Sequence, residues 1–511
     1  MNDFGAAPAA PCARSGRRVG VVDVGSNSVR LVVFEALTRS PAYFFNEKVL
    51  CGLGADLQRS GALSPEGRRR ALAAIGRFCA LARKMEVDAL DGVATAAIRD
   101  ATDGAEFRDL IETETGLRLR IASGEDEARL AAQGVLLGWP DAQGLVADLG
   151  GASLELVRVG GGAVQGVGRS FPLGPLRLAR LSREEADAEI DRALDQARDL
   201  MGLPGERLFL VGGAWRAFAK IHMARIDYPL QVLHEFSQTG EDMLAAAQAI
   251  ALCVPDDLAK EVSASSARLA VTPLGAQVLA RLIEAARPGQ VAISAFGLRE
   301  GVLYEHLSPE MRAEDPLLSA ARAMETALGR FPGFGDELAD WVAPLFEDVA
   351  PRRRRIIRAA CLLSDVSWNA HPDHRDVACL ETVHRANLTG ISHGERAFMG
   401  ATLSHRYRSG RKLRARAPAL GLLDGEDLTL AKRLGRAIRL GAMLTGSAPG
   451  SLPNSRLAPG EGALRLTLSP AIASLSGEMV EKRLAALAQT MGLTPDLRID
   501  AGWAPTWANS G

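Results

Sequence analysis

The most regular pattern of hydrophobic and polar positions in this chain is a hydrophobic run interrupted once by an aspartate and a few small residues. Residues 21–34 read VVDVGSNSVRLVVF, and residues 145–157 read LVADLGGASLELV. Each stretch has the pattern of two apolar strands joined by a tight turn, which predicts a β-hairpin. Aligning them superimposes identical residues: Asp23 on Asp148, Gly25 on Gly150, and Ser28 on Ser153. The repeat therefore predicts a duplicated domain.

Other segments follow the hairpins in an alternating order of strands and helices. Short apolar runs predict strands, and apolar residues at helical spacing predict helices. The predicted strands are 91–95, 117–122, 207–213 and 290–294, and the predicted helices are 103–115, 182–201, 214–225, 273–287 and 297–306. Ser182 and Glu185 form a capping box at the start of one helix. This alternation indicates layered α/β structure.

Length and composition place the chain among soluble globular proteins. Its 511 residues predict three or four domains, and 47% hydrophobic with 24% charged residues is ordinary for this class. The formal net charge of -1 gives no global field toward nucleic acid or a membrane. No uninterrupted apolar run approaches about 18 residues, so we expect no transmembrane helix.

The N-terminus and the cysteines favour a cytoplasmic protein. Residues 1–17 lack the apolar core of a secretory signal and are expected to form a disordered tail. The six cysteines are scattered without a C-x-x-C pair, which indicates buried thiols in a reducing compartment.

The two predicted hairpins also carry possible ligand chemistry. Glycine permits positive φ and close approach of the backbone to a ligand, and successive turn N–H groups can form an anion site. An aspartate at a strand end can bind a metal directly or through water. One such hairpin is usually only a turn. Two matched copies favour two phosphate-binding hairpins that face each other across a cleft.

A run of acids begins the segment SGEDEARL at residues 123–130. Ser123 is a plausible N-cap, and Asp126 completes a capping box. At about 100° per residue, Glu125, Asp126 and Glu127 cannot all point the same way. They can simply complement the helix dipole, or one can enter the cleft and orient or deprotonate a water. A helix start is expected to keep such a carboxylate ionised.

Six motifs in order resemble the exopolyphosphatase / guanosine pentaphosphate phosphatase (Ppx/GppA) family. They are VDVGSNSVRL, ATAAIRDA, SGEDEARL, VADLGGASLEL, VGGAW and FGLREGVLYE. The resemblance covers about residues 18–308. It implies the α/β actin-like (ribonuclease H-like) ATPase fold, with one domain over 18–135 and its duplicate over 136–308, flanking a cleft.

The resemblance also implies roles for individual residues. Glu127 matches the catalytic glutamate, and Arg99 matches an arginine that contacts phosphate. The acidic residues associated with Mg²⁺ and the attacking water match Asp23, Asp148 and Glu155. The phosphate loops match Gly25, Ser26, Asn27, Ser28, Gly150, Gly151, Ala152 and Ser153. The family usually has a third glycine where this chain has Ala152, which retains its N–H but restricts φ.

The C-terminal part, residues 309–511, has helical spacing at 351–364 and 474–491. In the family it resembles an all-α HD-type phosphohydrolase domain, whose metal chemistry needs an adjacent His-Asp pair. Here Ser364 precedes Asp365, so we expect a degenerate, structural HD-like domain. The scattered histidines of this region are then hydrogen-bonded or solvated rather than metal ligands.

Two basic stretches lie in the same region. Residues 352–358 contain RRRR, and residues 405–440 hold ten Lys or Arg against three acids. They can be solvated helix faces or a guide for a polyanion. The candidate polyanion path comprises Arg406, Arg408, Arg411, Lys412 and Arg414. We expect no nucleic-acid partner, because no aromatic stacking motif accompanies the charges.

The function predicted from these features is Mg²⁺-assisted release of terminal phosphate from inorganic polyphosphate. The near alternative is hydrolysis of guanosine pentaphosphate by the same residues. VGGAW at 211–215 lies where the superfamily binds adenosine, so an ATP-dependent kinase is a further alternative, and a polyanion-sensing regulator is a non-catalytic one. The family resemblance implies a homodimer, and no segment suggests a membrane partner.

Overall fold

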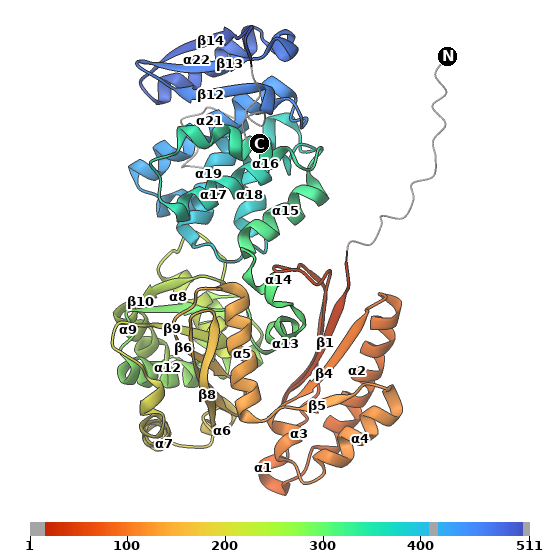
Figure 1. Ribbon diagram of the computed structural model, residues 1–511. Coiled ribbons are helices and arrows are strands. Elements are labelled where there is room, and N and C mark those ends of the chain that lie inside the picture. The colour runs from red at the N-terminus through yellow and green to blue at the C-terminus, as the bar shows by residue number, and fades with distance from the viewer. Residues whose placement is uncertain (1–15, 408–416, 504–511) are drawn as a thin grey trace. The chain divides into compact units, whose positions relative to one another are not determined.

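The computed structural model describes residues 16–407 and 417–503 of the chain (Figure 1). It divides into two compact units. The first comprises residues up to Phe218 together with Gln238–Ala313, and the second comprises Ala219–Ser237 and the chain from Glu314 onward. The predicted boundary at 308/309 lies near this division, whereas Ala219–Ser237 was assigned by the sequence to the preceding domain.

The first unit begins with a five-stranded sheet in the order β3-β2-β1-β4-β5. Antiparallel pairing joins β1 to β2 and β2 to β3, and parallel pairing joins β1 to β4 and β4 to β5. The strands are β1 (Val19–Val24), β2 (Ser28–Phe34), β3 (Tyr43–Leu50), β4 (Ala89–Ala94) and β5 (Leu119–Ile121). The first hairpin is therefore β1–β2.

A second sheet in this unit repeats the same plan. Its order is β8-β7-β6-β9-β11-β10, in which β6–β7–β8 is the antiparallel part and β9 and β11 run parallel to β6. The strands are β6 (Gly144–Leu149), β7 (Leu154–Gly160), β8 (Ala163–Phe171), β9 (Arg207–Gly212), β10 (Ser237–Thr239) and β11 (Gln290–Ile293). The second hairpin is β6–β7, so the predicted duplication is present as matching strand order. We call the parts built on the two sheets the first and the second lobe.

Helices flank both sheets (Figure 1). In the first lobe they are α1 (Leu57–Ser60), α2 (Pro65–Lys84), α3 (Ala96–Asp100) and α4 (Gly104–Thr115). Helix α5 (Gly124–Gly138) comes next and packs against β6, β7 and β8 of the second sheet. Those that follow are α6 (Pro175–Leu178), α7 (Arg183–Gln196), α8 (Gly213–Arg225), α9 (Gly240–Ile250), α10 (Pro255–Glu261), α11 (Ser266–Leu269), α12 (Thr272–Ala286), α13 (Leu298–His306) and α14 (Pro309–Ala313).

Helices α5 and α13 approach each other unusually closely. A Cβ on Gly301 of α13 would lie 1.9 Å from the carbonyl oxygen of Leu130, and one on Gly134 of α5 would lie 2.3 Å from that of Gly297. Only glycine allows this contact. The contact fixes α5, which carries Glu127, against the segment that carries Arg299.

The second unit is mainly helical. Its helices include α15 (Pro316–Leu328), α16 (Phe334–Val342), α17 (Pro351–Leu362), α18 (Arg375–Arg385), α19 (His393–Tyr407), α21 (Gly425–Thr445) and α22 (Glu478–Thr490). Its core includes Phe334, Leu338, Phe398 and Leu434, all nearly or fully buried.

The expectation of an all-α region is incomplete. A three-stranded sheet, in the order β12-β13-β14, follows α21. Its strands are β12 (Ser455–Pro459), β13 (Ala463–Leu468) and β14 (Thr494–Ile499).

One described stretch, Ser266–Ala286, is long and apolar enough to cross a membrane by length and composition alone. However, most of this stretch is buried inside the protein, as in the core helices of soluble proteins. It contains α12, whose buried residues include Val278, Leu279 and Leu282. Its burial explains its apolar composition without a membrane.

Candidate active site

The two hairpin turns have the same local structure. The N–H of Gly25 donates to the carbonyl of Ser28 (3.0 Å), and the N–H of Gly150 donates to that of Ser153 (2.9 Å). In each case a Cβ on the glycine would meet only the opposite serine, with its carbonyl oxygen at 3.5 Å. The glycines thus keep one face of each turn free of side-chain atoms.

Of the two reasons that the sequence analysis offered for these glycines, positive φ is wrong. None of Gly25, Gly150 and Gly151 has positive φ. Close approach, rather than left-handed backbone, is therefore what glycine provides. Ala152 also has no positive φ, so alanine is accommodated where the family usually has glycine. A Cβ on Gly174 would lie 2.2 Å from the carbonyl carbon of Ala152, so the neighbouring chain packs directly on this residue.

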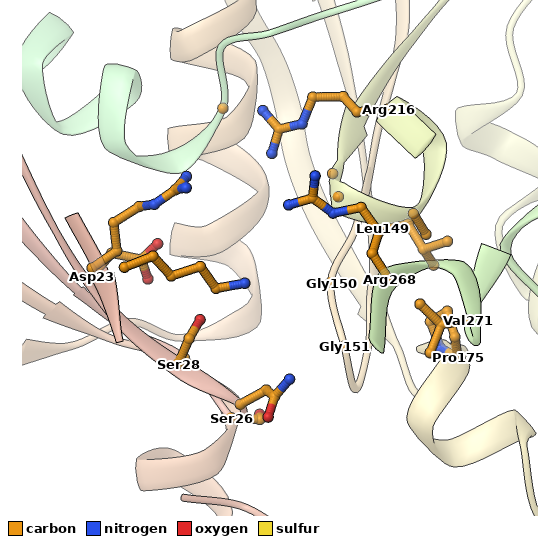
Figure 2. A pocket seen from close by; sticks show the side chains of 18 of the residues that line it. Asp23, Ser26, Ser28, Leu149, Gly150, Gly151, Pro175, Arg216, Arg268 and Val271 are labelled. Carbon is orange, nitrogen blue, oxygen red and sulfur yellow. The ribbon is translucent and has the colours of Figure 1, made fainter. Parts of the chain in front are cut away.

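Both turns open on one cavity of about 330 Å³ within the first unit. Figure 2 shows Asp23, Ser26 and Ser28 on one side of it, and Gly150, Gly151, Arg216 and Arg268 on the other. The predicted residues that line it are Asp23, Gly25, Ser26, Asn27, Ser28, Asp148, Gly150 and Gly151. Arg99, Glu127, Ala152, Ser153 and Glu155 are not among the lining residues.

The three acidic side chains at the start of α5 lie in different environments. Glu125 is exposed, and Asp126 forms the predicted capping box with Ser123, through contacts of 3.0 and 3.1 Å. Only Glu127 is buried, with 8% of its surface exposed. Arg99 donates to the Glu127 carboxylate and, at 2.9 Å, to the carbonyl of Ala122. The structure thus joins the predicted base to the predicted phosphate-binding arginine.

Burial controls the protonation of the acidic residues near the cavity. It raises the pKa of Glu127 to about 7; Arg99 opposes this shift, and the charges of Asp148 and Asp23 add to it. Burial likewise raises the pKa of Asp148 to about 6. The expectation that the helix start keeps Glu127 ionised is therefore wrong, because desolvation outweighs the helix dipole.

Glu155 lies directly opposite Asp148 in the β6–β7 register and is 3% exposed. Ser170 donates to its carboxylate at 2.7 Å. Burial raises the pKa of Glu155 well above its usual value, and the charges of Glu127 and Asp148 raise it further. Its position indicates an influence on Glu127 and Asp148 rather than direct contact with a ligand in the cavity.

The sequence predictions omitted the cations that line the cavity, which are Arg30, Lys48, Arg216, Arg268 and Arg299. Arg299 lies 3.9 Å from the Asp23 carboxylate. Arg216 donates to the carbonyl of Ala295 at 2.8 Å. Arg30 and Arg299 belong to VDVGSNSVRL and FGLREGVLYE, so the signal was present in two quoted motifs. No local pattern could have identified Lys48 or Arg268.

The family model described as the Ppx/GppA phosphatase family matches residues 32–310, more than half of the 511 residues. The chain belongs to the Ppx/GppA phosphatase family. A second model, described as the C-terminal part of exopolyphosphatase, matches residues 317–497. The first match begins within β2, after the first hairpin turn, and covers the rest of the two lobes, and the second covers most of the helical region.

Several named relatives resemble the chain over different lengths. Retrograde regulation protein 2 of Saccharomyces cerevisiae is 26% identical over 435 residues, covering 76% of this chain and 72% of the relative. Exopolyphosphatase 1 of Mycobacterium bovis is 34% identical over 166 residues, covering 32% of this chain and about half (48%) of the relative. Guanosine-5'-triphosphate,3'-diphosphate pyrophosphatase of Vibrio cholerae is 24% identical over 509 residues, covering 94% and 96%.

A solved structure of the Aquifex aeolicus Ppx/GppA family member covers 57% of this chain and 99% of its own, with a TM-score of 0.50 and 23% identity. This likeness concerns the fold. Together with the family match, it confirms the predicted actin-like architecture, which is visible here as two sheets of matching strand order.

If this Ppx/GppA member uses a magnesium ion, Asp23 and Asp148 are the residues that would hold it. Asp23 and Asp148 both line the cavity, and burial raises the pKa of each. The raised pKa values indicate that the surrounding protein does not fully compensate the negative charges of these two carboxylates. Mg²⁺ typically uses one or two carboxylates, substrate phosphates and water. In the described part of the chain, no three His, Cys, Asp or Glu side chains form a preformed metal centre. A site completed by substrate phosphate matches this arrangement.

The second unit uses the remnant of the HD motif structurally. Arg330 donates twice to the Asp365 carboxylate, at 2.7 and 2.8 Å, and Arg406 donates to it at 2.9 Å. Arg406 is 6% exposed, so it cannot serve an exposed polyanion path. Arg408, Arg411, Lys412 and Arg414 lie outside the described residues.

The RRRR run forms ion pairs within the second unit and is also partly a solvated face, because Arg352 and Arg354 are exposed. Arg352 binds Glu395 (2.7 Å), Arg353 binds Asp427 (2.5 Å), and Arg355 binds Asp315. Arg358 binds Asp336 at 2.5 Å. These contacts join α17 to four other segments of the second unit and neutralise most of the run.

Proposed function

We propose that this protein hydrolyses the terminal phosphoanhydride bond of inorganic polyphosphate. The observation that carries the proposal is a single cavity lined by two glycine turns, two aspartates and five cations. The buried Glu127, paired with Arg99, is close enough to Asp148 and Asp23 for their charges to influence it. Backbone N–H groups and guanidinium groups together bind phosphate oxygens. The exopolyphosphatase names of relatives support this choice of substrate.

In the proposed reaction, a water oxygen forms a bond to the terminal phosphorus and the bridging P–O bond breaks. Glu127 accepts the proton from the water, and the shortened chain leaves with the bridging oxygen. Arg99 can turn from Glu127 to a phosphate oxygen, which would free the carboxylate as the substrate binds. Mg²⁺ held by Asp23 and Asp148 would neutralise phosphate oxygens. Positioning and charge stabilisation supply the catalysis, as is usual for phosphoryl transfer.

Guanosine pentaphosphate is the second candidate substrate. Two observations favour it: the nearly full-length match to the Vibrio cholerae pyrophosphatase, and the apolar side chains of Leu149, Leu176 and Val271 in the cavity lining. Apolar surface of this kind suits a nucleoside. Such an activity would connect the protein to the stringent response.

Cellular setting and assembly also remain proposals. We propose a cytoplasmic location, which the free thiols of Cys51, Cys79, Cys361 and Cys379 support. The proposal of a homodimer rests on family resemblance. Light scattering of the full chain, which measures its molar mass in solution, tests this proposal.

The activity is tested by measuring phosphate release from long polyphosphate, guanosine pentaphosphate and ATP side by side, with magnesium. The proposal expects the highest kcat/KM with polyphosphate. A preference for guanosine pentaphosphate would select the second candidate. Phosphate transfer from ATP to an acceptor would select a kinase, and tight polyphosphate binding without release would select a polyanion sensor.

A further inference from the structure

A short segment after β3 holds the carbonyl groups of the first glycine turn. The Ser26 carbonyl accepts from the N–H of Gly54 at 2.8 Å. The Asn27 carbonyl accepts from two further N–H groups of residues 51–54, both at 3.0 Å. None of these three donors belongs to the residues that line the cavity, so the segment supports the turn from outside. We call residues 51–54 the first backing segment.

The second turn is held in an equivalent way. The Gly151 carbonyl, which aligns with that of Ser26, accepts from the N–H of Leu176 at 3.0 Å. Leu176 follows β8 just as the first backing segment follows β3, and each strand is the third of its antiparallel part. Figure 2 shows Pro175 on the same side of the pocket as Gly151. Residues 174–176 are therefore a second backing segment, and the duplication includes both.

Glycines allow the backing segments to contact their turns closely. A Cβ on Gly54 would lie 3.3 Å from the Ser26 Cβ, and one on Gly174 would lie 2.2 Å from the carbonyl carbon of Ala152. Helix α2 packs directly on the first backing segment, because a Cβ on Gly67 would lie 2.8 Å from a backbone Cα of that segment. Close packing therefore fixes the first segment itself.

A contact that holds a carbonyl also aims the N–H of the same peptide. In a trans peptide bond the C=O and the N–H point in opposite directions. The contacts at Ser26 and Gly151 therefore turn the N–H groups of Asn27 and Ala152 away from the backing segments. Neither N–H has a hydrogen-bond partner in the part of the chain that the structure describes. Each turn thus keeps one amide donor available for a ligand.

We propose that the two backing segments are positioning elements, which keep the N–H groups of Asn27 and Ala152 turned toward the substrate phosphates. The role rests on the phosphate hydrolysis proposed above and concerns the same cavity. If the peptide between Ser26 and Asn27 turned over, a carbonyl oxygen would replace the N–H donor. That oxygen would repel the phosphate oxygens instead of binding them.

The two turns differ in how much they need this support. Turning over the central peptide, as between type I and type II β-turns, gives the third residue of the turn a positive φ. Asparagine tolerates positive φ better than most residues, whereas alanine tolerates it poorly. Asn27 and Ala152 hold this position, and neither has positive φ. The first turn, which has asparagine there, therefore depends more on its backing segment.

The test follows tripolyphosphate binding with magnesium in the full-length Glu127→Gln protein, which separates binding from turnover. Selective isotope labelling of asparagine gives few NMR signals, because the chain has few asparagines, and Asn27→Ala identifies the signal of Asn27. The Asn27 amide proton should move to higher frequency as tripolyphosphate binds, because the N–H then donates to a phosphate oxygen. An unmoved Asn27 signal during saturable binding would overturn the proposal.

Gly54→Pro removes the N–H that holds the Ser26 carbonyl. It should weaken tripolyphosphate binding about tenfold, the size of one lost charged hydrogen bond, and abolish the movement of the Asn27 signal. Gly54→Ala is the matched control, because it keeps the N–H and should retain most of the affinity. Adding Asn27→Ala to the Gly54→Pro protein should recover affinity, since alanine disfavours the reversed peptide. A general loss of structure would not be recovered in this way.

Thermal unfolding shows whether each variant is folded, and the Asn27 signal of the Glu127→Gln protein decides the proposal even without the proline variant. Unchanged affinity of Gly54→Pro, or no recovery with Asn27→Ala, would overturn the positioning role while leaving hydrolysis by the wild type intact. If the wild type releases no phosphate yet the Asn27 signal responds, the positioning role stands and the hydrolytic function fails. Absence of tripolyphosphate binding would overturn both.

Discussion

At the scale of single residues, burial distinguishes Glu127 from its neighbours Glu125 and Asp126. The sequence placed the helix start correctly, because an N-cap and its capping box are local. It could not determine which carboxylate is desolvated, since that depends on β6, β7 and β8 packing against α5. The same limit applies to the cavity cations, which converge from segments far apart in the chain.

The raised pKa of Glu127 predicts the acid limb of the pH–rate profile. A base must be deprotonated to accept a proton, so kcat/KM should fall as pH drops through about 7. Arg99 lowers the pKa of Glu127, so Arg99→Gln should move this limb to higher pH as well as lower the rate. Initial rates from pH 5 to 9 measure both effects. If the acid limb of the pH–rate profile stays at the same pH in the Arg99→Gln variant, Arg99 does not lower the pKa of Glu127.

Asp148 provides a prediction about magnesium. Asp148→Asn keeps the size of the side chain and removes its charge, so it should weaken metal binding more than it alters the fold. The magnesium concentration for half-maximal activity should rise about tenfold, since a charged contact is lost. An unchanged magnesium titration at full activity would mean that Asp148 only ends a strand.

At the scale of elements, the hairpins and the alternating helices were predictable because their signals are local in sequence. Predicted strand 207–213 is β9, and predicted helix 273–287 is α12. The small C-terminal sheet was missed, although Leu464, Leu466 and Leu468 alternate after the Gly-Glu-Gly turn at 460–462. The β12–β13 hairpin lies in a region that the sequence analysis assigned to helices because of its helical spacing. Strand β14 could not be recognised as a partner of β13 from a local pattern, because α22 separates the two strands in sequence.

The α5–α13 contact carries an element-scale prediction. Gly301→Ala would place a methyl group 1.9 Å from the Leu130 carbonyl oxygen and push the helices apart. Overpacking of this kind costs about 1–3 kcal/mol, so denaturant unfolding should show lower stability. Activity should fall too, because α5 carries Glu127.

Gly76→Ala is the control for this change, because its new methyl group meets only Thr115, at 4.0 Å. Within helix α2 the substitution should be neutral or stabilise the protein by about 0.5–1 kcal/mol. Equal stability of the Gly76 and Gly301 variants would contradict the close-packing account.

At the scale of the whole molecule, the two units have different physical tasks. The first carries the cavity and its acidic residues, while the second joins its helices through ion pairs such as Asp365 with Arg330 and with the buried Arg406. Net charge gave no hint of this division, because the RRRR run of the second unit is largely matched by acids distant in sequence.

The second unit should lose stability in mild acid. Burial lowers the pKa of His393 to about 4 from an ordinary value of 6.5. Its Nε2 lies 3.0 Å from the His234 carbonyl oxygen, and its Nδ1 lies 3.0 Å from the Tyr228 hydroxyl, which suits a neutral ring that donates once and accepts once. The unfolded chain therefore binds the proton more readily than the folded chain between about pH 6.5 and 4.

The contribution of the neutral His393 to the free energy of unfolding is complete above pH 6.5 and is lost as pH falls toward 4. For this histidine the loss between pH 7.5 and 5 is about 2 kcal/mol. Hydrogen exchange of α19 at the two pH values measures it. His393→Gln should lower stability at pH 7.5 and reduce the difference between the two pH values. A difference as large as in the wild type would exclude His393 as its source.

The central claim, that Glu127 is the base of a phosphoanhydride hydrolase, is tested most directly by comparing Glu127→Gln with Glu125→Gln. The measurement is steady-state phosphate release from long polyphosphate, with binding followed separately by calorimetry. Glu127→Gln should lower kcat by about 10²–10⁴ and preserve binding, because it keeps size and hydrogen bonding but removes the proton acceptor. The exposed Glu125→Gln should retain wild-type turnover. Turnover of the Glu127→Gln protein within about threefold of wild type would contradict the account.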